Sequence, residues 1–196
     1  ALSSAASDVY KRQANVQFVA FTDHSNYFDS KTNANVEGAL YDTSLVKDSD
    51  ANHSWSTYKS TIDAFNAENA GSMVALGGFE MTWSGGPGHI NTFNTPGVVS
   101  RNNTTLNNKT DDAGMKAYYA LLSQAEGVDS ISQFNHPGTT FGNFSDFSYW
   151  DPVIDSRMYM VEVGNGEGQI GAGGYYPSYE QYIMALDKGC LLYTSD

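Results

Sequence analysis

Short apolar runs that end in polar residues or glycine recur along the chain, and each is typical of a buried β-strand. These runs predict strands at residues 17–22, 73–79, 89–95, 130–135 and 158–163. Segments with apolar residues at helical spacing lie between them and predict helices at residues 54–69, 111–126 and 178–188. Strands that alternate with helices predict an α/β fold with a mostly parallel sheet.

Polar residues and glycines mark the ends of the predicted helices. Ser178 precedes the last helix and Gly189 follows it, which is the pattern of a side-chain N-cap and a C-terminal glycine. The helix at residues 111–126 starts with two aspartates, which suits the positive end of the helix dipole. These end signals support the predicted boundaries.

Composition excludes several classes of protein. The 196 residues fit one domain with a sizeable core. The chain has 10 Lys and Arg against 22 Asp and Glu, which makes its net charge −12. It therefore lacks the basic surface that general binding to nucleic acid or to anionic membranes requires. No apolar run approaches the roughly 20 residues of a membrane-inserted helix. The single cysteine excludes a disulfide framework and a cysteine-rich zinc site.

The two ends of the chain differ in character from the rest. Residues 4–13 (SAASDVYKRQ) and 190–196 (CLLYTSD) resemble translated primer or adapter sequence of the kind found at contig ends in assembled environmental DNA. We therefore expect residues 1–13 and 190–196 to be non-native tails and residues 14–189 to form the domain. The alternative is that both ends are ordinary native termini. If they are tails, a signal peptide cannot be read from this sequence.

Three of the four histidines lie beside the ends of predicted strands. His24 follows the first strand, His89 begins the third and His136 follows the fourth, while Glu80 follows the second. Loops converge at the carboxyl ends of parallel strands, so we expect these side chains to lie together. Imidazole and carboxylate ligands suit zinc, manganese or iron. The fourth histidine, His53, is expected at the surface.

The order of the motifs TDHSN, GFEMTW, GHIN and NHPG resembles the polymerase-and-histidinol-phosphatase (PHP) family of metal-dependent phosphoesterases. More narrowly, it resembles the bacterial branch found in secreted or surface multidomain proteins. The likeness spans residues 14–189 and includes YWDPVID and VEVGNGEG. It implies a distorted (β/α)7 TIM-like barrel, here truncated at both ends, with up to three metal ions at the carboxyl ends of the strands.

The resemblance also implies roles for individual residues. Glu80 would bridge two metal ions, and His89 and His136 would complete the ligands of the second ion. These three residues would act in catalysis through the bound metal. His24 would bind a third ion.

Other residues would support the site. By the same resemblance, Asp23 and Asn135 would orient the metal ligands through hydrogen bonds. Three tryptophans are candidates for the wall of a substrate cleft: Trp55, Trp83 and Trp150. Trp83 is the best of them because it follows the Glu80 motif closely, and packing in the core explains it equally well.

The chain also departs from the family pattern. The family opens with a His-x-His strand and ends with an Asp-x-His pair, and neither occurs here. The first metal site would therefore lose most of its ligands, and the third would keep only His24. The second keeps Glu80, His89 and His136, which suffice for one divalent ion: zinc, manganese, iron or magnesium.

The resemblance implies that the parent protein is a metal-dependent hydrolase of small phosphorylated or ester substrates. This chain would keep one metal site and little activity. Two alternatives stay open: hydrolysis of another ester or a carbamate, and a non-catalytic surface or interaction domain whose metal site has degenerated. The full-length protein would have room for partner domains. Few lysines and abundant Asn, Ser, Thr, Gly and Tyr indicate an extracellular or cell-surface protein, with a cytoplasmic location as the alternative.

Overall fold

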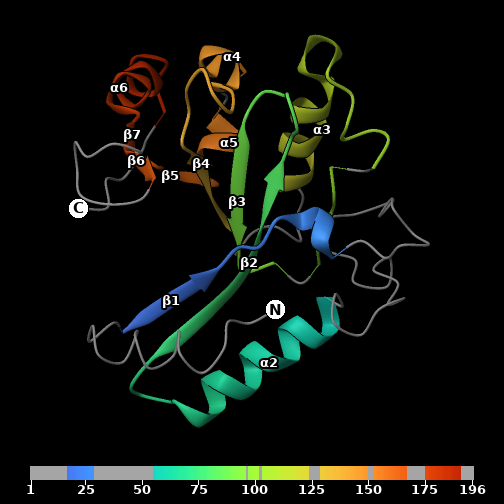
Figure 1. Cartoon of the computed structure of the whole chain (residues 1–196), viewed down its shortest axis with the longest axis vertical. Coiled ribbons are helices and arrows are strands. Elements are labelled where there is room, and N and C mark those ends of the chain that lie inside the picture. Colours follow the sequence, from blue (N-terminus) through green and yellow to red (C-terminus); the bar gives the residue numbers. More distant parts are fainter. Residues whose placement is uncertain are drawn as a thin grey trace.

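The computed structural model describes residues 17–28, 55–95, 97–101, 103–123, 129–149, 152–166 and 175–190. Its centre is a mixed sheet in the order β1-β2-β3-β4-β5 (Figure 1). The strands are β1 (Phe18–Phe21), β2 (Val74–Thr82), β3 (His89–Phe93), β4 (Ile131–Asn135) and β5 (Met158–Val161). The pairs β1–β2 and β4–β5 are parallel, and β3 runs antiparallel to both of its neighbours.

Helices surround the two ends of this sheet. The longer ones are α2 (Trp55–Glu68), α3 (Ala113–Leu122) and α6 (Tyr179–Asp187). Short ones are η1 (Ser25–Tyr27), η3 (Thr110–Asp112), α4 (Phe144–Phe147) and α5 (Pro152–Asp155). Strands β6 (Gly164–Gly166) and β7 (Tyr175–Pro177) form a separate antiparallel pair. Helix α2 lies beside β1 and β2, and the helices α3 to α6 lie around the other end (Figure 1).

The predicted (β/α)7 barrel is wrong for the described residues, because they form an open sheet with β1 and β5 at its edges. The predicted mostly parallel sheet is also wrong, since β3 is antiparallel to β2 and β4. The connection between β2 and β3, residues 83–88, gives the physical reason. A parallel connection needs a dozen or more residues, so a link this short can only form a hairpin.

The five predicted strands and three predicted helices all occur, with shifted ends. Strand β2 continues to Thr82 because its ladder with β3 continues and because the Glu80 N–H donates to the Asp23 carbonyl at 2.9 Å. Glu80 therefore lies within the strand and not after it. Ser178 precedes α6 but makes no side-chain cap; its hydroxyl donates to the Pro137 carbonyl at 2.8 Å instead.

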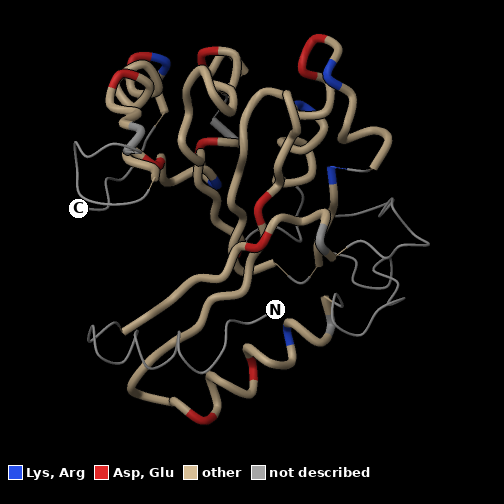
Figure 2. The backbone as a smooth tube through the Cα atoms, viewed as in Figure 1, with Lys and Arg blue, Asp and Glu red and all other residues tan. Residues whose placement is uncertain are grey.

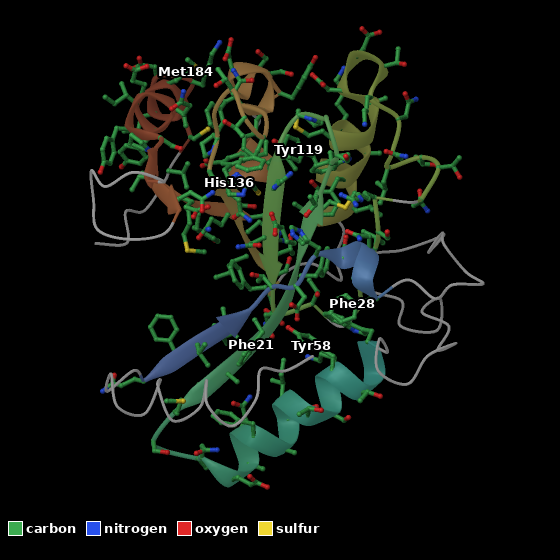
Figure 3. The ribbon with its side chains drawn as sticks, in the orientation of Figure 1. Phe21, Phe28, Tyr58, Tyr119, His136 and Met184 are labelled. Carbon is green, nitrogen blue, oxygen red and sulfur yellow. The ribbon has the colours of Figure 1, made fainter. Side chains whose placement is uncertain are left out.

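Apolar side chains at helical spacing attach α2 to the sheet. Trp55, Tyr58 and Ile62 are buried and pack with Phe79 of β2 in the core. Each such side chain contributes about 1.5–3 kcal/mol through burial. Tyr58 points toward Phe21 of β1 (Figure 3), and its hydroxyl contacts the Phe21 carbonyl at 2.7 Å. Helix α2 thereby holds together β1, which His24 follows, and β2, which carries Glu80.

Several sequence predictions fall on residues that are not described. His53, Trp150, residues 1–13 and residues 191–196 lie outside the described ranges. Cys190 is described and is buried in the core, where its N–H donates to the Ala185 carbonyl. No helix in the described part of the chain combines the length and the apolar character needed to cross a membrane.

Candidate metal site

The strand directions bring the candidate residues to one edge of the sheet. Because β3 is antiparallel to β2 and β4, its first residue lies at the edge where those strands end. His24 follows β1, His89 begins β3 and His136 follows β4, so all three lie at this edge. The prediction that the histidines meet at strand ends is confirmed, although the sheet is mixed.

The pairing register then puts the polar side chains on one face. Glu80 pairs with Asn91, Thr82 pairs with His89, and His89 pairs with Asn135. Directly paired residues point to the same face, and successive residues alternate between faces. The alternate positions carry buried apolar residues: Met81, Ile90 and Phe134. The sheet therefore has an apolar core face and a polar face at the same strand ends.

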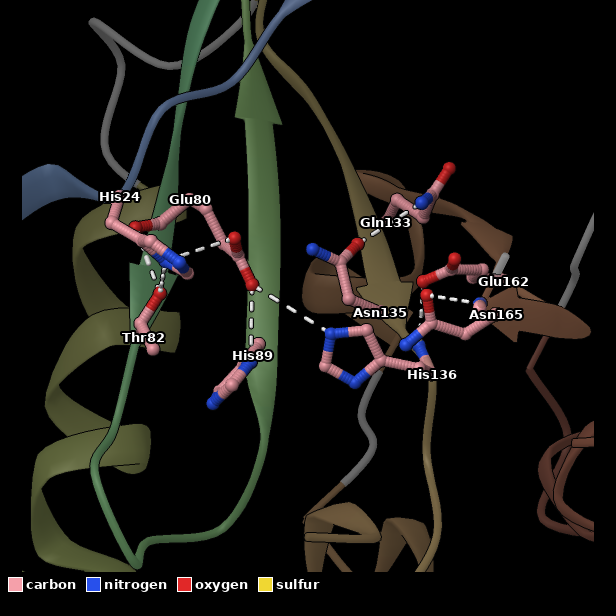
Figure 4. Close-up of polar contacts among 10 residues, drawn as sticks. His24, Glu80, Thr82, His89, Gln133, Asn135, His136, Glu162 and Asn165 are labelled. Atoms are coloured by element: carbon pink, nitrogen blue, oxygen red, sulfur yellow. Dashed lines mark hydrogen bonds and ion pairs between the residues drawn. The ribbon is translucent and has the colours of Figure 1, made fainter. Parts of the chain in front are cut away.

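Glu80, His89 and His136 form a compact group that could hold a metal ion (Figure 4). One ligand atom from each residue lies within 4.8 Å of the other two. Glu80 Oε1 lies 3.1 Å from His89 Nδ1 and 3.8 Å from His136 Nε2. The three side chains are 10–13% exposed, so the group is largely shielded from water.

The polar atoms of this group lack the hydrogen bonds that burial demands. Glu80 Oε1, His89 Nδ1 and His136 Nδ1 are buried without a hydrogen-bond partner among the described residues. Leaving such a group unsatisfied costs about 1–3 kcal/mol. A carboxylate oxygen and imidazole nitrogens are ligands for divalent metals, so a cation beside Glu80 Oε1 and His89 Nδ1 would satisfy these two atoms and take His136 Nε2 as a further ligand. The residues present therefore fit a metal ion.

The electrostatics of the group favour the protonation states that bind a metal. Burial tends to raise the pKa of Glu80, but the His89 contact, the charges of His24 and His89, and the Asn135 amide together lower it below its ordinary value. Burial lowers the pKa of His136, and its proximity to His89 adds to this effect. A carboxylate and a neutral imidazole are the forms that coordinate a metal.

His136 is placed by an unusual backbone. Its φ is +29°, in the region that residues other than glycine rarely adopt. Its N–H donates to Glu162 Oε2 at 2.9 Å (Figure 4). Strain of this kind costs about 1–3 kcal/mol and is typical of functional sites. The Glu162 carboxylate therefore stabilises the turn that aims the His136 ring toward Glu80.

His24 contacts the group without belonging to the triad. Its ring is 41% exposed, and Nδ1 lies 3.1 Å from Glu80 Oε2 and 2.7 Å from Thr82 Oγ1. It therefore contacts the carboxylate oxygen that does not face the other histidines. Asp23 acts through its main chain, since its carbonyl accepts the Glu80 N–H while its side chain is exposed. The buried Asn135 amide accepts a hydrogen bond from Gln133 at 3.0 Å.

A cleft of about 560 Å³ opens beside the triad and is lined by His24 and His89. Trp83 also lines it and is buried, so the structure leaves the cleft-wall and the core interpretations of this residue both open. Its indole N–H donates to the Leu106 carbonyl at 2.7 Å, which fixes the ring. The other candidate, Trp55, is buried under α2.

Sequence reasoning missed Asn91, Phe141 and Glu162. Asn91 has a buried Oδ1 without a partner in the described structure and lies directly across from Glu80. The Phe141 ring lies 5.4 Å from the His89 ring and 4.6 Å from the His136 ring, and so covers both. The sequence placed Glu162 inside the predicted strand at residues 158–163, whereas in the structure it directly follows β5. The sequence contained a signal for Asn91, because it lies two positions after His89 and therefore on the same face of the predicted strand.

The fold and this site together define an α/β protein with a histidine–glutamate group that could hold a metal ion. Comparison of the chain with models of known families, with curated proteins and with solved structures gives no match. The resemblance to the PHP family therefore stays a prediction from the motifs.

Proposed function

We propose that this protein binds one divalent metal ion through Glu80, His89 and His136 and uses it to hydrolyse small phosphoester substrates slowly. The observation that carries the metal site is the convergence of ligand atoms from three adjacent strands, of which Glu80 Oε1 and His89 Nδ1 are buried without a hydrogen-bond partner in the described structure. The hydrolytic chemistry follows from the donor set and the adjoining cleft, together with the motif order. A structural metal site would have closed coordination, whereas three protein ligands leave a position for substrate or water.

The residues of the site support this chemistry in distinct ways. A divalent ion held here would supply Lewis-acid polarisation of the ester and activation of a water molecule. Glu80 supplies negative charge close to the ion, and His24 orients that carboxylate through its second oxygen. Phe141 covers the two imidazole ligands and limits the access of water to them. The cleft beside His89 has the volume of a small-molecule site.

Slow turnover is expected because one ion would stand in place of the cluster of up to three ions that the resemblance implies. Phosphoryl transfer is fastest where two metal ions clamp the attacking and leaving oxygens. Groups that act as a unit in catalysis are strongly non-additive, so a single ion retains only a small part of the rate of a complete cluster.

The test combines metal analysis with a substrate panel. Purified protein is loaded with zinc, manganese, iron or magnesium, and the bound metal is measured by inductively coupled plasma mass spectrometry. We expect about one ion per chain, slow turnover of p-nitrophenyl phosphate that a chelator removes, and loss of both in His136→Ala. His53→Ala is the matched control, since His53 belongs to none of the metal motifs and the variant should retain both the ion and the turnover.

Other outcomes would contradict the proposal. If the protein hydrolyses a carboxylic ester or a carbamate but no phosphoester, it is a hydrolase of another substrate class. Bound metal without turnover of any substrate would favour a non-catalytic domain. No bound metal after incubation with each ion would overturn the site itself.

A further inference from the structure

We propose that the cleft beside the triad is an oxyanion site, in which Arg101 holds a phosphate or carboxylate group of a small ligand. This inference rests on the proposed function for its claim that the anion is part of a substrate. The binding of an oxyanion to Arg101 stands on separate observations. The proposal specifies the chemical class of ligand that the cleft would bind.

The first observation is the position of Arg101. Arg101 lines the same 560 Å³ cleft as His24 and His89. An anion held by its guanidinium would therefore share one cavity with the metal-binding face of the sheet. A ligand that fills such a volume is a small molecule, and 300–1,000 Å³ is the usual range for such sites.

The second observation is that Arg101 has no partner among the residues that the structure describes. Its side chain is partly buried, and no described residue accepts a hydrogen bond from it or forms an ion pair with it. Other basic side chains are engaged: Lys109 donates to the Ser84 carbonyl, Lys116 lies 4.2 Å from the centre of the Tyr149 ring, and Arg157 donates to the Leu122 carbonyl. A guanidinium without a protein acceptor is a group that an external anion can satisfy.

The third observation is the charge of the cleft lining. The chain carries 22 acidic residues, but within the described ranges none of them lines this cleft, and Arg101 is the one Lys or Arg that does. Figure 2 shows acidic residues on α2, on α6 and near the start of α3, and also in the middle of the sheet on β2 and after β1. The remaining polar lining includes neutral groups such as the hydroxyls of Ser84, Thr139 and Thr140. The Glu80 carboxylate contacts both lining histidines at 3.1 Å, so within this lining an anion would bind at Arg101.

The chemistry of arginine specifies the ligand class. A guanidinium is planar and presents parallel N–H donors that match two oxygens of a phosphate or a carboxylate. The hydroxyls of Thr139 and Thr140, on another lining segment, offer further donors. The cleft therefore suits a small molecule with one terminal oxyanion, oriented by Arg101 toward the metal-binding histidines.

The experiment measures anion binding directly and needs no turnover. Isothermal titration calorimetry of the full chain, with and without metal, uses inorganic phosphate in one arm and acetate in the other. We expect at least one of these anions to bind, and Arg101→Ala to weaken its affinity about 10-fold or more. Arg101→Lys should recover part of the affinity, because charge without the planar fork is a weaker match. The anion whose affinity falls in Arg101→Ala shows whether the ligand group is a phosphate or a carboxylate.

Two controls make the result specific. Lys188→Ala removes the same charge from the exposed end of α6 and should leave the affinity unchanged. Metal content and circular dichroism of Arg101→Ala should match the wild type. Equal affinity of the wild type and a folded Arg101→Ala would overturn the proposal, as would no binding of either anion. Arg101-dependent anion binding in a chain that takes up no metal would overturn the proposed function and support the oxyanion site.

Discussion

Glu80 Oε1 lies 3.1 Å from His89 Nδ1 across two paired strands, yet neither atom makes a hydrogen bond within the described structure. At this distance the two form an ion pair when the imidazole is protonated, whereas with a neutral imidazole both atoms remain available to a cation. The nearest nitrogen of His136 lies 3.8 Å from the same oxygen, beyond ordinary hydrogen-bond length. The three ligand atoms thus lie close together, and a cation between them would satisfy Glu80 Oε1 and His89 Nδ1 and take His136 Nε2 as a further ligand.

This relationship predicts the effect of neutralising Glu80. Glu80→Gln keeps the shape of the side chain and removes its charge, so affinity for a divalent metal should fall about 100-fold or more, the loss that even supporting residues of metal sites can cause. Glu180→Gln makes the same change at an exposed position of α6 and should bind metal as the wild type does. Competition titration against a chelating dye measures both affinities. Equal affinity of the two variants would show that Glu80 is not a ligand.

The pKa of His136 predicts how stability depends on pH in metal-free protein. Burial holds this pKa below its ordinary value of 6.5, so below about pH 6.5 the unfolded chain takes up a proton that the folded chain resists. The free energy of unfolding should therefore fall as the pH drops from 6.5. The lowered pKa of Glu80 has the same sign and adds a further loss below about pH 4.5.

The titration of Glu162 should change the free energy of unfolding in the opposite direction. Burial raises its pKa, so its contribution to stability is lost as the pH rises above about 4.5. Urea unfolding in the presence of a chelator, measured from pH 4 to 8, follows these changes. His136→Asn should remove the loss that begins at pH 6.5, and asparagine tolerates the positive φ of this position. An unchanged pH profile in this variant would assign the acid sensitivity to another group.

The loop that carries Phe141 depends on one glycine. Gly142 has φ +105°, and a Cβ there would overlap the Pro87 carbonyl. Gly142→Ala should therefore lower the free energy of unfolding by about 1–3 kcal/mol. Its partner in the same β-bridge, Gly138, has no described atom within 4 Å of the place that a Cβ would take, so Gly138→Ala should change stability by less than about 0.5 kcal/mol. Chemical denaturation of both variants compares them, and equal stabilities would contradict the packing of this loop on Pro87.

The thiol of Cys190 should be inert in the folded protein. Burial raises its pKa to about 12, with Asp155 adding to the effect, so almost no thiolate is present at pH 8. Labelling by Ellman's reagent at pH 8 should be slow in native protein and fast in denaturant. Fast labelling of native protein would show that the end of α6 opens readily and that this thiol is not held in the core.

Local patterns predicted the elements well, since burial periodicity and chain-breaking residues act over a few positions. The run at residues 17–22 and the helical spacing of Trp55, Tyr58 and Ile62 are examples, and both elements occur within a residue or two of their predicted ends. The histidines beside strand ends were likewise predicted to meet. The closed, mostly parallel barrel was wrong because strand direction is decided when the sheet assembles. The strands β3 and β4 are antiparallel although a long connection that carries α3 joins them.

The sequence by itself determined which residues could bind a metal, because ligand type is a property of the side chain and strand ends are marked locally. The tertiary structure alone decided which of them form the group. Register across three strands brings Glu80, His89 and His136 together and leaves His24 at the side. It also decided the parts played by Glu162 and Arg101, whose neighbours are far away along the chain. Such contacts arise only when the whole sheet assembles, since no short stretch of sequence contains both partners.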